Sequence, residues 1–153
     1  MVAECLGTLL TMHPSAMMGE LLGRCADPKD SLTRWTVASA LKYAMTGNAP
    51  RQELEANLGT VLTLLSDEDL GVRQAGLQLC NAAVHHQPSL IAPHLSVVVL
   101  PAIFEAMLLK MPRVVDLGPF KQTIDDALPL RKAALATANT ILEDLPEVLA
   151  LNS

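Results

Sequence analysis

The distribution of apolar residues along the chain is typical of α-helices. In residues 52–65, leucine and valine recur at intervals of three and four, at Leu54, Leu58, Val61, Leu62 and Leu65. This spacing places the side chains on one face of a helix. Similar patterns predict helices over residues 2–12, 17–22, 32–45, 70–84, 90–109, 128–142 and 145–151. The sequence therefore predicts an all-α fold with a single long interruption.

Prolines and short polar residues mark the ends and bends of these helices. Asp30 or Ser31 is placed to cap the helix over residues 32–45, in which Trp35 is expected to help fill the core. The helix over residues 90–109 is expected to bend at Pro93 or Pro101. The sequence thus predicts both the helix boundaries and one irregular helix.

The interruption lies at Arg113–Thr123. Two short runs, Val114–Leu117 and Phe120–Thr123, flank the pair Gly118-Pro119. Gly tolerates a positive φ, and Pro cannot continue a helix, so the pair predicts a turn. We interpret the segment as a β-hairpin that projects from the helices and binds a partner. The alternative is an ordered loop without a partner.

An internal repeat relates the turns at Asp67 and Asp125. Asp67, Leu70 and Arg73 match Asp125, Leu128 and Arg131 at an offset of 58 residues, and a weaker copy places Arg34 on Arg73 at an offset of 39. An Asp-led turn followed by an apolar-Arg step looks like a HEAT repeat. The 19 additional residues of the longer offset accommodate the predicted hairpin, since insertions in such repeats fall in loops.

The four charged residues of the two matching turns suggest a stacking device. We hypothesise that Asp67, Arg73, Asp125 and Arg131 form a ladder in which each Arg bridges to the acidic turn of a neighbouring repeat. The alternative is that each Arg is a solvated surface charge.

Composition narrows the range of partners and compartments. The net charge is −5 and only 3% of residues are aromatic, which argues against a nucleic-acid partner. Three scattered cysteines predict a reducing compartment, the cytoplasm or nucleus, with each thiol buried. The most apolar stretch, residues 95–109, is shorter than the ~20 residues that a bilayer needs, so no membrane contact is expected.

No arrangement of side chains predicts an enzyme. His85, His86 and His94 lack the spacing of a metal site, and the acidic turns lack the glycine and bidentate Glu of a calcium loop. We expect no catalytic residue, metal or cofactor.

Several segments together resemble one known family. They are Val2–Gly7, Asp67–Arg73, Gln87–Ile91, Leu117–Asp126 and Leu130–Ala134. In this order they are similar to the cullin-associated and neddylation-dissociated proteins, which are long HEAT-repeat solenoids. The run from Gly118-Pro119-Phe120-Lys121 into Asp125-Asp126 is the most specific of them, and the resemblance extends over essentially the whole chain.

The resemblance implies a fold and a mechanism. The fold would be an α-solenoid over residues 1–153 as a single segment of about three and a half HEAT repeats, with a β-hairpin inserted near residues 111–124 and further repeats beyond this piece. The function would be non-enzymatic regulation of cullin–RING ubiquitin ligases. The protein would bind the N-terminal region of an unneddylated cullin. Its hairpin would compete with the substrate-receptor adaptor and so promote receptor exchange.

The partner-binding residues implied by this mechanism are those of the hairpin. They are Arg113, Val114, Val115, Asp116, Leu117, Gly118, Pro119, Phe120, Lys121, Gln122 and Thr123. By physical type, Val114, Leu117 and Phe120 would contact apolar partner surface, with Arg113 and Lys121 at the rim.

Other functions remain open at this stage. The chain could be a generic HEAT scaffold of the transport or phosphatase kind, a partner of the TATA-binding protein, or a structural segment that only stacks against its neighbours. A second expected partner is a further HEAT-repeat chain of the same protein.

Overall fold

The computed structural model describes residues 1–147. Its helices are α1 (Val2–Met12), α2 (Pro14–Arg24), α3 (Ser31–Met45), α4 (Arg51–Val61), α5 (Leu70–His86), α6 (Pro88–His94), α7 (Leu100–Leu108) and α8 (Leu128–Asp144). A 3-10 turn, η1 (Leu62–Ser66), extends α4, and a π-helical turn, η2 (Leu95–Val99), joins α6 to α7. Two strands, β1 (Pro112–Leu117) and β2 (Phe120–Asp125), separate α7 from α8. The expectation of a mostly helical chain with one hairpin is confirmed.

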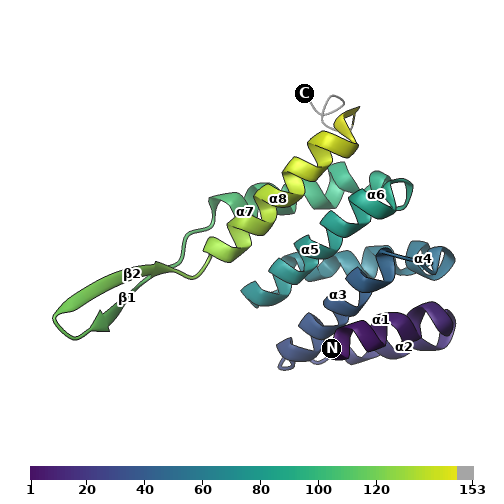
Figure 1. The fold of residues 1–153 in the computed structure, drawn as a ribbon, viewed down its shortest axis with the longest axis horizontal. Coiled ribbons are helices and arrows are strands. Elements are labelled where there is room, and N and C mark those ends of the chain that lie inside the picture. The colour runs from purple at the N-terminus through teal and green to yellow at the C-terminus, as the bar shows by residue number, and fades with distance from the viewer. Residues whose placement is uncertain (148–153) are drawn as a thin grey trace.

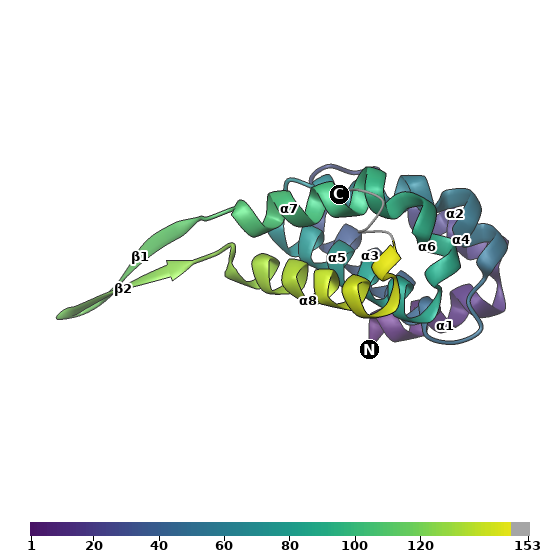
Figure 2. The ribbon, with the colours of Figure 1, turned by 90° about the horizontal axis from the view of Figure 1, so that it is seen from above.

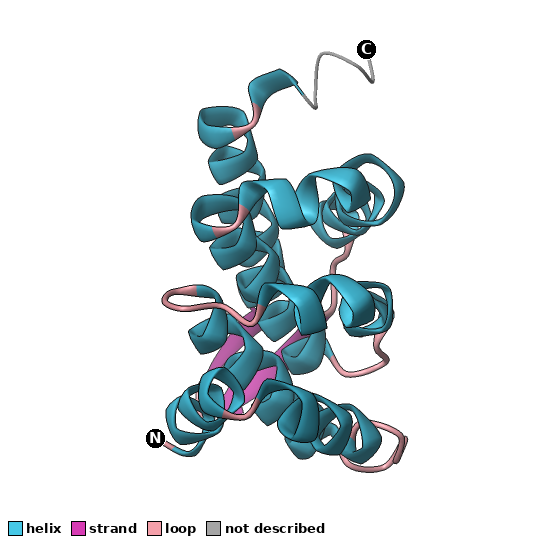
Figure 3. Ribbon diagram, turned by 90° about the vertical axis from the view of Figure 1, so that its right-hand side faces the viewer, coloured by secondary structure: helices cyan, strands magenta, loops and turns pink. Residues whose placement is uncertain are grey.

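The helices lie in two layers (Figures 1 and 3). In the first layer α1 packs on α3, α3 on α5 and α5 on α8, while α2, α4, α6 and α7 form the second layer. Helices α3, α5 and α8 all begin along the edge from which the hairpin projects (Figures 1 and 2). The turns that precede these helices therefore follow one another along this edge of the stack.

The core between the layers is built from the residues that repeat at helical spacing. All five periodic residues of the α4–η1 segment are buried, as predicted: Leu54, Leu58, Val61, Leu62 and Leu65. Trp35 was wrongly expected in the core, because 45% of its surface is exposed. The buried face of α3 runs through Val37, Leu41 and Met45, and Trp35 lies outside that stripe.

Aspartates cap two of the helices that begin at the hairpin edge. The Asp30 carboxylate accepts a hydrogen bond from the Thr33 N–H at 3.0 Å, which confirms Asp30 as the cap of α3. Asp69 caps α5 in the same way, by accepting from the Val72 N–H at 3.0 Å. Asp67, the leading residue of the predicted turn, accepts instead from the Asp69 N–H and so shapes the turn before the helix.

The apolar helix near the middle of the chain is longer than predicted. Within residues 1–147, one continuous helical stretch, Pro88–Leu108, is long and apolar enough to cross a membrane by length and composition alone. Length therefore does not exclude a membrane span, contrary to the sequence argument. One face of the stretch packs in the core, where Ile91, Leu95, Val99 and Ile103 are at most 1% exposed, whereas Val97, Phe104 and Leu108 are exposed. The irregular turn, η2, lies between the two prolines.

The three cysteines occupy different environments. Cys80 is buried, and burial raises the pKa of its thiol to about 12, so it packs as a small apolar group. Cys25 is half-buried, whereas Cys5 is exposed on α1. The prediction that each thiol is buried is wrong for Cys5, which is exposed.

Gly7→Ala is expected to destabilise the contact between α1 and α3. A Cβ at Gly7 would lie 2.8 Å from the Ala40 carbonyl oxygen and 2.9 Å from the Tyr43 Cβ, so the helices would have to separate. The expected loss in unfolding free energy is about 1–3 kcal/mol, as for overpacking elsewhere. Gly19→Ala in α2 is the control, because its Cβ would meet no atom within 4 Å.

Chemical denaturation of both variants checks this expectation. Gly19→Ala should raise the unfolding free energy by up to about 1 kcal/mol, since Ala is the better helix former. Equal effects of the two substitutions would show that the α1–α3 contact is not tightly packed.

Candidate functional site

The hairpin is a two-stranded antiparallel ribbon that extends away from the helices (Figures 1 and 2). Its register pairs Leu117 with Phe120 at the tip and Pro112 with Asp125 at the base. The strands are longer than predicted by one residue on β1 and two on β2, measured against Arg113–Thr123. Most of its side chains are exposed, and none of the described helices covers either face.

The turn at the tip has the expected backbone chemistry. Gly118 has a φ of +80°, a conformation that side chains disfavour. Pro119 follows with its φ near −65° by ring closure. A positive φ at the first of two loop residues is the type II′ arrangement, whose twist matches that of the flanking strands. Local sequence therefore determines the turn.

The two faces of the ribbon differ in character. Residues directly opposite each other share a face, so Leu117, Phe120 and Val115 lie together on one face. The other face carries Val114, opposite Thr123, and the charged pair Asp116 and Lys121. Val114 therefore lies on the face opposite Leu117 and Phe120, and the predicted contact of all three with a partner stays a prediction. One face is largely apolar, and the other is mixed.

Asp125 clasps the base of the hairpin. Its carboxylate accepts hydrogen bonds from the Met111 N–H at 2.9 Å, the Ala127 N–H at 3.0 Å and the Arg131 guanidinium at 2.6 Å. Arg131 also donates to the Leu109 carbonyl at 2.9 Å, which ties α8 to the end of α7. Asp125 and Arg131 thus connect the two chain segments that enter and leave the hairpin.

A second link at the base is more exposed. Arg113 donates to the Asp126 carboxylate at 2.8 Å, and the Asp126 N–H donates to the Met111 carbonyl at 3.0 Å. Arg113 was expected at the rim of a partner contact. In the structure its side chain turns back to the protein.

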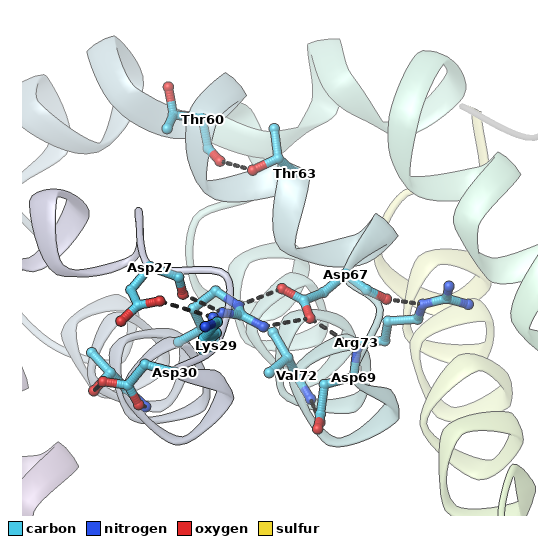
Figure 4. Close-up of polar contacts among 11 residues, drawn as sticks. Asp27, Lys29, Asp30, Thr60, Thr63, Asp67, Asp69, Val72 and Arg73 are labelled. Atoms are coloured by element: carbon cyan, nitrogen blue, oxygen red, sulfur yellow. Dashed lines mark hydrogen bonds and ion pairs between the residues drawn. The ribbon is translucent and has the colours of Figure 1, made fainter.

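The remaining two residues of the predicted ladder lie at the turn before α5 (Figure 4). Asp67 accepts from Arg34 of α3 through both carboxylate oxygens, at 2.6 and 3.1 Å. Arg73 donates to the Asp67 carbonyl, and its guanidinium lies 3.9 Å from Glu105 of α7. The structure thus brings Asp67 and Arg73 together, and Asp125 and Arg131 together, but connects the first pair to neighbouring elements through Arg34 and Glu105.

Arg34 is the most deeply buried charge of this network. It is 8% exposed, and besides Asp67 it donates to the Asp27 carbonyl at 2.6 Å. It therefore joins the turn before α3 to the turn before α5. The internal repeat included Arg34 only as part of its weaker copy. The signal that could have predicted this bridge was an Arg at the equivalent step of the earlier turn.

Hydrogen bonding lowers the pKa values of both turn carboxylates. Burial alone would raise the pKa of Asp67, but the hydrogen bonds from Arg34 and the Asp69 N–H outweigh it and hold the pKa below its usual value. The pKa of Asp125 is lowered mainly by the hydrogen bond from the Met111 N–H, with further contributions from Arg131 and the Ala127 N–H. These hydrogen bonds outweigh burial, which raises the pKa.

Acid should therefore weaken the fold. The folded pKa of each carboxylate lies below its unfolded value of about 3.9, so its stabilisation is complete well above that pH and is lost as pH falls through the folded pKa. Unfolding near pH 3 should take up fewer protons in an Asp67→Asn, Asp125→Asn variant than in the wild type, because both carboxylates have lowered pKa values in the folded state. Denaturation curves between pH 6 and 2.5 measure the difference. Parallel pH dependences would contradict the assignment.

Comparison with known proteins gives matches along nearly the whole chain. Residues 90–153 match the TIP120 family model, described as TATA-binding protein interacting (TIP20). The chain is 36% identical over 146 residues to cullin-associated NEDD8-dissociated protein 1 of Dictyostelium discoideum, covering 93% of this chain and 12% of that protein. The protein of the same name in Arabidopsis thaliana is 34% identical with the same coverage.

A further relative is itself described as part of a protein. Cullin-associated NEDD8-dissociated protein 1, C-terminal part, of Emericella nidulans is 34% identical over 150 residues, which is 94% of this chain and 14% of that protein. The chain thus spans 12–14% of the length of these relatives. The hairpin residues lie within the matched region of the family model.

Proposed function

We propose a function from the premise that this chain is related to the cullin-associated NEDD8-dissociated proteins, as its matches over 93% of its length confirm. The chain acts as a non-enzymatic, cullin-associated regulator of cullin–RING ubiquitin ligases. It binds the N-terminal region of an unneddylated cullin, and its hairpin occupies the place of the substrate-receptor adaptor. Adaptor and hairpin then compete, which promotes receptor exchange. The protein works in the cytoplasm and nucleus.

One observation carries this proposal: the hairpin exposes apolar side chains far from the core. Leu117 is 55% exposed and Phe120 is 72% exposed, on one face of a ribbon that no other element within residues 1–147 covers. An isolated two-stranded ribbon is only marginally stable in water. The hydrogen bonds of Asp125 at its base and contact with a partner surface would both stabilise the ribbon. Such a tip is suited to a hydrophobic pocket of a partner, where aromatic and large apolar residues contribute most of the binding energy.

We also propose that the helices form a stretch of a HEAT-repeat α-solenoid of about three and a half repeats, continued by further repeats of the same protein. The exposed faces of the two terminal helices of the first layer support this. Leu128, Leu135 and Leu142 recur every seven residues along α8, and each is exposed by 41–56%. Val2, Leu9 and Met12 form a similar exposed stripe on α1. Stacked neighbouring repeats would bury both stripes.

A second candidate function is binding to the TATA-binding protein. The description of the family model that matches residues 90–153 favours it. In that case the chain would have a transcriptional role, and the hairpin would be one element of a different interface.

A pull-down with two immobilised partners tests both functions. One partner is the N-terminal domain of an unneddylated cullin, and the other is the TATA-binding protein. We expect retention on the cullin and displacement by added adaptor. Retention only on the TATA-binding protein would favour the second function. Retention on neither would reject both for this segment and leave it a stacking role.

A further inference from the structure

A groove of about 670 Å³ crosses the exposed surfaces of α3, α5 and α8, away from the hairpin tip. Its lining includes small residues, Ala82 and Ala133, that allow a ligand to approach the helices closely. Lys42 of α3 and Lys132 of α8 line its two sides. The three helices lie next to one another in the first layer (Figure 1), so α5 lies between the α3 side and the α8 side of the groove.

A row of amide side chains runs along the middle of the groove. Gln74, Gln78 and Asn81 lie on α5 at intervals of four and three, hence on one face of that helix. None of the three amides forms a side-chain hydrogen bond with any residue between 1 and 147. Each amide both donates and accepts, as does each peptide unit of a main chain.

The spacing of this row matches an extended peptide. Four residues of α-helix rise about 6 Å. Two residues of an extended chain, the interval at which its N–H and C=O groups point the same way, rise about 6.7 Å. Gln74 and Gln78 can therefore hydrogen-bond to successive equivalent peptide units of a strand that lies along α5.

The charge of the groove selects the side chains of that strand. The whole chain has 16 acidic and 11 basic residues, yet the described residues that line the groove include two lysines and two histidines and no Asp or Glu. Neither Lys42 nor Lys132 forms an ion pair with another residue of the described part of the chain. Two ammonium groups on opposite sides complement carboxylates on neighbouring residues of the bound strand, because successive side chains of an extended chain point to opposite sides.

We propose that this groove binds an acidic segment of a partner protein in extended conformation. Gln74, Gln78 and Asn81 bind its main chain, while Lys42 and Lys132 bind its carboxylates. This contact is separate from the hairpin, so it does not depend on the function proposed above.

Fluorescence anisotropy tests the proposal with a labelled ten-residue peptide in which Ser-Ser and Glu-Glu pairs alternate, so that carboxylates point to both sides of the extended chain. The Lys42→Gln, Lys132→Gln variant should bind at least about tenfold more weakly, since two charge-assisted hydrogen bonds are lost. The matched control is Lys29→Gln, Lys110→Gln, which removes the same charge from exposed sites outside the groove and should bind within about twofold of the wild type. Equal weakening by both pairs would overturn the proposal, because it would indicate only long-range attraction.

Two further arms separate main-chain recognition from charge. A backbone N-methylated peptide with the same carboxylates should bind at least about fivefold more weakly, and so should the unmodified peptide to the Gln74→Ala, Gln78→Ala variant. If neither loss occurs, or if single-stranded polyuridylate binds the groove as tightly as the peptide, the groove does not recognise an extended peptide. The chain that lacks the hairpin tip should bind the peptide normally, so failure here is distinguishable from failure of the hairpin mechanism.

Discussion

Replacement of Val114–Lys121 by a short Gly-Ser turn is expected to abolish competition with the adaptor while leaving the helices intact. The segment adds no side chain to the core, and Asp125 and Arg131 still clasp the base. Leu117 and Phe120 would lose their contacts in the partner, at about 1–2 kcal/mol for each side chain. The adaptor-displacing activity should therefore fall by at least about tenfold.

Displacement of labelled adaptor from a cullin N-terminal domain measures this effect, and circular dichroism checks the fold. Two point variants refine it, since the ribbon has two different faces. Leu117→Ser, Phe120→Ser should weaken displacement nearly as much as the deletion, whereas Val114→Ser, Thr123→Ala on the opposite face should weaken it little. Unchanged displacement after the deletion would remove the hairpin from the mechanism. Equal effects of the two faces would place the contact along the edges of the ribbon.

Arg34→Met removes a buried charge and is expected to cause a large loss of stability. Met retains much of the volume of the side chain but leaves the Asp67 carboxylate in its buried site without its main partner, since both side chains are only 10% exposed. Removal of one partner from a buried ion pair is costly because the other charge remains desolvated. The melting temperature should fall by about 5 °C or more.

The exposed pair Arg24–Glu20 provides the matched control. Its atoms are 2.7 Å apart, almost the same distance as in the buried pair, but its side chains are 66% and 58% exposed. Arg24→Met should change the melting temperature by less than about 2 °C, because water replaces the lost partner. Thermal denaturation of both variants decides the matter, and equal shifts would mean that Arg34 contributes no more than a surface charge. An Arg34→Met, Asp67→Leu variant should regain part of the loss, since no unpaired charge remains.

The elements that sequence could predict are those that depend on neighbouring residues. The α4–η1 core positions followed from a repeat of three and four, and the presence of a turn followed from Gly118-Pro119. The separation of Val114 from Leu117 and Phe120 was also accessible, because a two-residue turn sets the pairing and pairing sets the face. That conclusion requires only alternation along the strands.

The sites that sequence could not predict join distant parts of the chain. Arg34 and Asp67 are 33 residues apart, and the roles of Asp125 and Arg131 depend on where α7 ends relative to α8. The groove needs Lys42, Gln78 and Lys132 from three different helices to face the same hollow. No local pattern in the sequence predicts that these residues lie close together.

The sequence by itself therefore determined the helices, their principal apolar faces and the hairpin turn, because periodicity and backbone preference act over a few residues. Tertiary structure alone decided which charges are buried, which side chains clasp the hairpin and which polar groups meet in the groove. The physical reason is that desolvation and hydrogen bonding depend on the packing of helices that are far apart in the chain.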